Sequence, residues 1–313
     1  MTRRAIWKSV LSLIFSAFMF LLIFWLVDFN IIDLGSYSVN WFIFGISSSL
    51  FFLNYALRAV RFRVLMVCDF SSAMLFSVSL LHGALNYLFP FKTGEFSFPV
   101  MSKIFLRRPL SESALALIIC RIMDLILIAV LMLGVFFFDN SLVASVVRVF
   151  ENVSRTGFYF VVSVMAITIF SFLVFFRVFR IGCLLSKYFA RFRNISCLQI
   201  ILIFMLTFLI WFCMLANFYF LSISMGYQIP FVTVALVSIL MTPLSMFPVQ
   251  GVANVGMFEL AWVTVLTLLG WSKDYAFQLA IKVHVLLTVQ VFMMILIGAI
   301  IIIMLKWSVK HAR

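Results

Sequence analysis

The sequence predicts an all-α polytopic membrane protein with about six spanning helices and two oppositely oriented re-entrant helical hairpins in an inverted repeat. Of the 313 residues, 66% are hydrophobic and the mean hydropathy is +1.24. Only 11% are charged, against about 25% in globular proteins. Several apolar runs are about 20 residues long, enough to cross a bilayer as helices. Two further apolar regions are interrupted by proline, glycine and charged residues. We expect one integral membrane domain over residues 1–313.

The spanning helices are expected where an apolar run is uninterrupted. The first run, Val10 to Val27, follows three basic residues and is too long for the core of a signal peptide, so we expect it to be retained. Before the last run, Ser272 is a suitable N-cap, and Asp274 falls in the first turn, where a negative charge is favourable. The expected spans are 9–27, 39–57, 113–137, 157–176, 196–223 and 279–305.

The two interrupted regions are 72–102 and 231–270, and each carries a proline, glycine and a carboxylate in apolar sequence. A helix loses backbone hydrogen bonds at Pro and Gly, and a bilayer has no water to replace them. Paired breaks of this kind are typical of the central site of a transporter. The residues are Pro90, Lys92, Gly94 and Glu95 in the first region, and Pro248, Gln250, Gly251, Asn254, Gly256 and Glu259 in the second.

The basic residues predict how the chain is oriented. The excess of positive charge sits in short loops, as the positive-inside rule expects, and this distribution also argues against nucleic-acid binding. The charge distribution predicts a multi-pass protein of the cytoplasmic (inner) membrane with both termini in the cytoplasm. The loops on either side of region 72–102 then lie inside, so this region enters and returns on one side, and region 231–270 does so from the other. Two ordinary kinked pairs of spans are the alternative. The basic clusters are Arg3–Lys8, Arg58–Arg63, Lys103–Arg108, Arg177–Arg193 and Lys306–Arg313.

Ionisable residues inside apolar sequence are candidates for substrate binding, because each costs at least a few kcal/mol near the bilayer centre unless it is paired or wet. Arg121 and Asp124 could form a structural pair on one helix face, or Arg121 could bind a lipid phosphate. Lys92 and Glu95 could form a structural turn or bind an anion near freed amides. The candidates are Lys92, Glu95, Arg121, Asp124, Glu259 and Lys282, with Gln250 and Asn254 as neutral partners.

Three of these interpretations stay open. Glu259 could stabilise the start of a helix, titrate a proton or contact a cationic headgroup. Lys282 could point inward beside Gln278 or extend to the membrane interface. The arginines of the loop after the second span could set topology only, or gather anionic headgroups at the inner interface. These last three are Arg58, Arg61 and Arg63.

The cysteines and histidines indicate no metal, cofactor or disulfide. The five cysteines show no C-x-x-C spacing, and most fall in apolar sequence, as small hydrophobic residues do. The three histidines, His82, His284 and His311, are scattered along the chain. We therefore expect no metal site and no cofactor.

Several motifs resemble the lysylphosphatidylglycerol synthase transmembrane-domain family, also called flippase-like, over roughly residues 5–305. Two residues depart from the family pattern: Cys120 stands where a Glu is usual, and Lys282 stands where the last helix usually has Arg. The motifs are Tyr55-Ala-Leu-Arg58-Ala-Val-Arg61-Phe-Arg63, Asn86-Tyr-Leu-Phe-Pro90-x-Lys-x-Gly94-Glu95, Arg121-Ile-Met-Asp124, Phe247-Pro248-x-x-Gly251-x-x-x-x-Gly256-x-x-Glu259 and Leu269-Gly270-Trp-Ser-Lys-Asp-Tyr-Ala276.

The resemblance implies a stand-alone membrane region without the soluble synthase domain. It implies flippase-like movement of a phospholipid or polyprenyl-phosphate-linked headgroup between leaflets, with membrane lipids as partners and no catalysis. A non-transporting accessory subunit, working with envelope biosynthesis proteins, is one alternative. A membrane glycosyl or phosphoryl transferase is another, although the loops carry no D-x-D motif or acidic cluster.

Overall fold

The computed structural model describes residues 38–66, 71–138, 197–245 and 251–311. These ranges form eight α-helices and no strand, which confirms the all-α prediction for the part of the chain they cover. The expected spans 9–27 and 157–176 lie outside the described residues.

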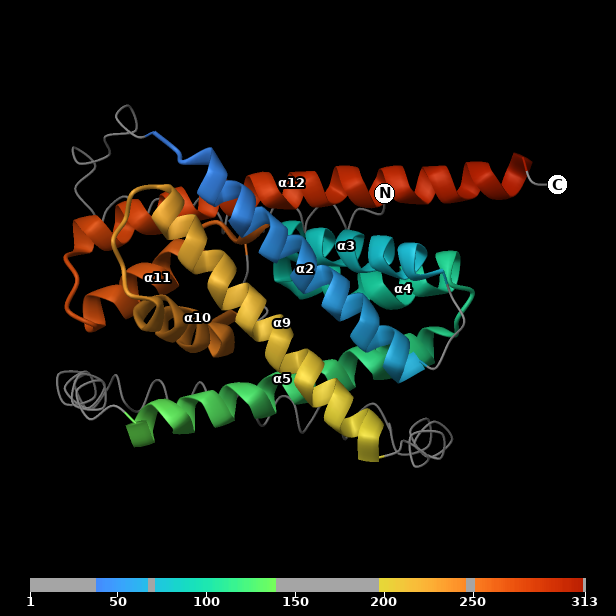
Figure 1. Ribbon diagram of the computed structural model, residues 1–313, viewed down its shortest axis with the longest axis horizontal. Coiled ribbons are helices and arrows are strands. Elements are labelled where there is room, and N and C mark those ends of the chain that lie inside the picture. The colour runs from blue at the N-terminus through green and yellow to red at the C-terminus, as the bar shows by residue number, and fades with distance from the viewer. Residues whose placement is uncertain (1–37, 67–70, 139–196, 246–250, 312–313) are drawn as a thin grey trace.

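Among the described residues, four helices are long and apolar enough to cross a membrane. In Figure 1, α12 and α5 run along opposite sides of the molecule, while α2 and α9 pack against each other and run obliquely between them. α2 continues past the expected end at Leu57, because the residues that follow contain good helix formers and neither Gly nor Pro up to Met66. The four are α2 (Trp41–Met66), α5 (Leu110–Phe138), α9 (Cys197–Ser224) and α12 (Lys273–His311).

The two interrupted regions each form a helix, a break and a second helix that packs back on the first. The two units lie at opposite ends of the long axis, and their breaks contact each other (Figure 1). The first unit is α3 (Ser72–Leu88), the 3₁₀ segment η2 (Pro90–Phe96) and α4 (Ser97–Phe105). The second is α10 (Phe231–Ser245), the 3₁₀ segment η3 (Val252–Asn254) and α11 (Met257–Leu268).

The first break lies directly on the backbone of α3. Pro90 opens η2, where its missing N–H costs nothing. A Cβ at Gly94 would lie 2.3 Å from the carbonyl oxygen of Leu85 and 2.4 Å from Cα of Asn86. Real Cβ atoms do not approach backbone this closely, so only glycine allows η2 to return against α3.

The second break contains three residues with positive φ. Ala253, Asn254 and Gly256 have φ of 52°, 63° and 87°. Glycine adopts such angles readily and Asn tolerates them, but Ala does so rarely and is strained there unless contacts hold it. α11 then begins at Gly256, where Oε2 of Glu259 accepts a hydrogen bond of 2.8 Å from the N–H of Gly256, the half of a capping box that a glycine N-cap allows. The capping role considered for Glu259 is therefore present.

A buried polar network joins three of the long helices. Nε2 of Gln290 on α12 donates to Oγ of Ser47 on α2 and to Oδ1 of Asn217 on α9, at 3.2 Å each. Ser47 also donates to Oδ1 of Asn217 at 2.6 Å. Such a network fixes the relative register of the helices, because each group would be costly to bury alone.

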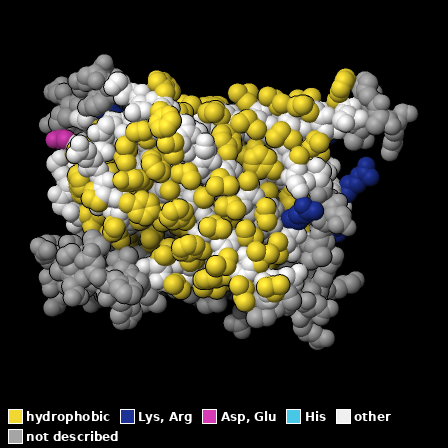
Figure 2. All heavy atoms as spheres, viewed as in Figure 1, with side chains coloured by type: hydrophobic (Ala, Val, Ile, Leu, Met, Phe, Trp, Pro, Cys, Tyr) yellow, Lys and Arg dark blue, Asp and Glu magenta, His cyan; other side chains and the backbone are white. Residues whose placement is uncertain are grey.

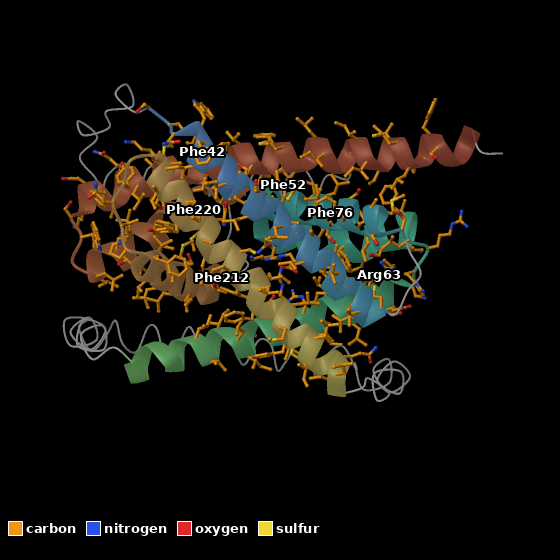
Figure 3. The ribbon with its side chains drawn as sticks, viewed as in Figure 1. Phe42, Phe52, Arg63, Phe76, Phe212 and Phe220 are labelled. Carbon is orange, nitrogen blue, oxygen red and sulfur yellow. The ribbon has the colours of Figure 1, made fainter. Side chains whose placement is uncertain are left out.

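The face of the molecule seen in Figure 2 is apolar between its two ends. Figure 2 shows hydrophobic side chains covering this face, with most of the visible Lys and Arg near the end where α2 finishes. Phe42 and Phe212, labelled in Figure 3, are 79% and 51% exposed. Exposed aromatic and aliphatic side chains in this amount suit contact with lipid.

Candidate functional site

An ion pair between α2 and α5 lies at the centre of the candidate site. Nη1 of Arg61 is 2.7 Å from Oδ1 of Asp124, and the Arg61 side chain is 2% exposed. The same nitrogen donates to Oγ1 of Thr207 at 3.0 Å, and Nε1 of Trp211 donates to Asp124 at 3.4 Å. α9 therefore completes the coordination of this pair, which satisfies most of its hydrogen-bonding groups.

A second ion pair ties the first break to α5. Nη2 of Arg121 is 2.6 Å from Oε1 of Glu95, and Nη1 is 3.9 Å from Oδ2 of Asp124. The sequence spacing suggested that Arg121 and Asp124 could pair with each other. Each instead has a closer partner on another element, because Glu95 of η2 and Arg61 of α2 both reach this face of α5.

Arg58 adds a third guanidinium one helical turn before Arg61. Its Nε donates to Oδ1 of Asn54 at 2.8 Å, and its guanidinium carbon lies 5.3 Å from the centre of the Tyr55 ring. Within the described ranges, Arg58 pairs with no carboxylate. Arginines 58, 61 and 121 thus outnumber the carboxylates Glu95 and Asp124. An excess of positive charge among apolar side chains favours binding of an anion.

Two hollows meet at Arg58. A narrow pocket is lined by His82 of α3 and by a charged cluster, which consists of Arg58, Arg61, Arg121 and Asp124. A cavity of about 220 Å³ lies beside it and reaches the second break at Asn254 and Phe258, and Tyr87 at the end of α3 also lines it. Tyr55 and Arg58 line both hollows. The cavity is therefore bounded by both helix–break–helix units and has one guanidinium in its wall.

A second polar centre lies where η3 meets α12. Oε1 of Glu259 is hydrogen-bonded to Nδ1 of His284, and Nε2 of His284 is 2.9 Å from the carbonyl oxygen of Ala253. The edge of the Tyr87 ring faces the imidazole at 5.9 Å between centroids, and the Tyr87 hydroxyl is 2.8 Å from Oγ1 of Thr288. His284 and Tyr87 were not among the predicted site residues.

The remaining predicted residues are spread between these centres and the surface. Lys92 is partly buried in the first break, with φ of 57°. Lys282 is buried, in agreement with the interpretation that it points inward. Its Nζ lies 5.3 Å from the centre of the Tyr227 ring, and the Tyr227 hydroxyl donates to Gln278 at 3.5 Å. The structure therefore places Lys282 beside the loop between α9 and α10. Pro248 and Gln250 lie outside the described residues.

The three arginines expected at the inner interface occupy different environments. Arg63 is exposed near the end of α2, where it donates to Oγ of Ser72 at 2.7 Å (Figure 3). Arg61 is buried and Arg58 lines the cavity, because α2 remains helical here and residues three apart share a face. The helical spacing of 58 and 61 was the signal that could have separated them from 63.

Comparison with known families agrees with this architecture. Residues 9–308 match the family described as the lysylphosphatidylglycerol synthase TM region. The chain belongs to this family. No curated protein and no solved structure matches it significantly. The family and the long apolar helices make it a multi-pass membrane protein of lipid metabolism or lipid flipping. The match covers nearly the whole chain, including both breaks and the charged cluster.

Proposed function

We propose that this member of the family moves a lipid, or a lipid-linked headgroup, between the leaflets of the cytoplasmic membrane without catalysing a covalent reaction. One observation carries the proposal: a cavity lies between two helix–break–helix units that start from opposite ends of the molecule, and the Arg58 guanidinium in its wall pairs with no carboxylate of the described residues. A path of this kind can be opened toward either end by moving one unit against the other.

The two units act in this proposal as re-entrant hairpins that enter the bilayer from opposite faces. The end of the molecule with Arg63, Lys103 and Arg107 carries exposed basic side chains, which supports a cytoplasmic position for this end. α12 finishes at the same end, so the proposal has a cytoplasmic carboxyl terminus. The first unit then enters from the cytoplasm and the second from outside. Their contacting breaks, η2 and η3, would lie near the middle of the membrane.

The charge of the cavity indicates which part of a lipid would enter. A phosphate matches the planar fork of Arg58, and Arg121 lies in the adjoining pocket to share its charge. The volume of about 220 Å³ is below the roughly 300–1,000 Å³ of pockets for drug-sized ligands. It suits a headgroup whose acyl or prenyl chains stay in the bilayer. Phospholipid and polyprenyl-phosphate headgroups share this chemistry.

The test is the movement of labelled lipids in liposomes that contain the purified protein. Fluorescent phosphatidylglycerol, aminoacylated phosphatidylglycerol and a polyprenyl phosphate are each assayed for loss of protection from a quencher that cannot cross the membrane. The wild-type protein should accelerate the movement of at least one of them. Arg58→Gln should slow it about 10- to 100-fold, the value of a charge-assisted hydrogen bond of about 1.5–3 kcal/mol.

Arg63→Gln is the matched control, because it removes the same charge from the same helix at an exposed position. It should move lipid at the wild-type rate. Two results would contradict the proposal: no acceleration for any of the three lipids, or an Arg58→Gln protein that is as fast as wild type. A protein that moves no lipid but co-purifies with envelope biosynthesis proteins at fixed stoichiometry would favour an accessory role.

A further inference from the structure

We infer that Glu259 and His284 form a binding site for a single proton, and that this proton holds the second break in its folded geometry. The inference goes beyond lipid movement and does not depend on it. Both side chains are buried, and the pair connects η3, α11 and α12 at one end of the cavity described above.

The hydrogen-bond partners fix where one hydrogen of the imidazole lies. Nε2 of His284 faces the carbonyl oxygen of Ala253, which can only accept a hydrogen bond. Nε2 must therefore carry a hydrogen and donate it. In a neutral imidazole this leaves Nδ1 without a hydrogen, as an acceptor.

The carboxylate on the other side is constrained in the same way. Oε2 of Glu259 accepts from the N–H of Gly256, and Oε1 faces Nδ1 of His284. Two acceptors cannot form a hydrogen bond without a proton between them. The contact thus needs one proton, carried either by Nδ1 as an imidazolium beside a carboxylate, or by Oε1 as a carboxyl beside a neutral imidazole.

Loss of this proton would place two lone pairs against each other in a site where His284 is 5% and Glu259 8% exposed. Buried polar groups without partners are costly, so the pair should separate. Separation would also withdraw Nε2 from Ala253. The break would then lose a contact that holds two non-glycine residues, Ala253 and Asn254, in left-handed backbone.

The other aromatic, polar and charged groups near the pair come from five elements of the described chain. α3 contributes the Tyr87 ring and hydroxyl, and α11 contributes the Phe258 ring at 4.6 Å from the imidazole centre. α9 and α10 carry no Asp, Glu, Lys, Arg or His. α2 contributes Arg58 across the cavity. η2, which contacts η3, carries Lys92 and Glu95. Lys282 on α12 faces Tyr227. Neither Glu259 nor His284 forms another ion pair within the described ranges.

The experiment is hydrogen–deuterium exchange of residues 251–260, in lipid nanodiscs, at several values from about pH 5 to about pH 9. The intrinsic exchange rate at each pH is divided by the observed rate, which gives a protection factor. Wild-type protection should fall about tenfold or more as the pH rises, in keeping with the loss of about one buried hydrogen-bonded contact.

Three variants accompany the wild type. In Glu259→Gln, the side-chain NH₂ can donate to Nδ1 while the oxygen accepts from Gly256, so protection should be high and independent of pH. His284→Ala should lower protection at every pH. Asp274→Asn removes an exposed carboxylate from the same helix as His284 and should behave as wild type.

Wild-type protection that does not change with pH would overturn the inference, whatever the variants do. So would a Glu259→Gln protein whose protection follows pH as the wild type does. Exchange of α2 and α9 residues in the same samples shows whether each variant is folded. Because no lipid movement is measured, failure here leaves the proposed function standing, and failure of the liposome assay leaves this inference standing.

Discussion

Arg61 on α2 and Asp124 on α5 form an ion pair of 2.7 Å in which both side chains are almost fully buried. They are 63 residues apart in sequence, and Thr207 and Trp211 of α9 complete the arrangement. The pair and its hydrogen bonds therefore connect three long helices, α2, α5 and α9, at the centre of the candidate site. It also neutralises one arginine of the cluster, which leaves Arg58 as the guanidinium that faces the cavity.

Removing one partner of this pair should destabilise the protein strongly. Arg61→Gln and Asp124→Asn should each lower the free energy of unfolding by about 3–5 kcal/mol, because each leaves the other charge buried without its counterion. Unfolding of the purified protein in detergent, followed by circular dichroism against denaturant, measures this. The double variant Arg61→Met with Asp124→Leu should lose less than the two single losses added together. Strict additivity would contradict the pairing.

Glu95→Gln should reduce lipid movement with little effect on stability. Glu95 and Arg121 are 25% and 35% exposed, more than Arg61 and Asp124, so we expect a smaller loss of stability than for that pair. The variant releases Arg121 from the first break and changes the charge beside the pocket. The liposome assay should show slower movement at wild-type expression. Thr93→Ala alters an exposed side chain of the same break and should be neutral. Wild-type movement by Glu95→Gln would remove Glu95 from the site.

Gly94→Ala should prevent the first break from folding against α3. The added Cβ would meet backbone atoms of Leu85 and Asn86, which cannot rotate away. A cost of about 1–3 kcal/mol or more is expected from overpacking of this kind. Gly45→Ala is a matched control, because nothing lies within 4 Å of its Cβ position on α2. It should be neutral or stabilise the protein by up to about 1 kcal/mol. Equal melting temperatures for the two variants would contradict the close approach.

Gln290→Leu should loosen the packing of α2, α9 and α12. The substitution removes three hydrogen bonds from Nε2 and leaves the Ser47 and Asn217 groups with fewer partners. A loss of about 1–3 kcal/mol is expected, measured by thermal unfolding. Val289→Ala, at a neighbouring position that is 42% exposed, should change stability by much less. A stable Gln290→Leu protein would indicate that the network does not fix the helices.

Local rules predicted the elements but not the partners of their side chains. Apolar length located α5, α9 and α12, and the breaks at Pro90 and Gly256 were predicted because backbone hydrogen bonding fails there. The end of α2 was placed too early, because basic residues were read as a loop. Pairs between side chains of different helices depend on how the helices are rotated against each other. This rotation cannot be inferred from a single sequence.

His284 illustrates the same limit. It lies in a long apolar helix with no motif around it, and only the fold brings its imidazole to Glu259 and Ala253. Arg58 and Arg61 differ from it, because their spacing of three residues already placed them on one helix face. Helical periodicity applied to the basic stretch would have assigned them to the interior and Arg63 to the surface.

The contact at Gly94 makes the two halves of the protein unequal in what they can do. With no room for even a methyl group between η2 and α3, neither segment can press closer to the other, and we expect them to move as one piece. η3 contacts α3 and η2, and a reversible hydrogen bond joins its Ala253 carbonyl to the His284 imidazole. Any opening of the polar interior should therefore begin on the side of α10 and α11, while the charged side stays in place and keeps its hold on whatever it has bound.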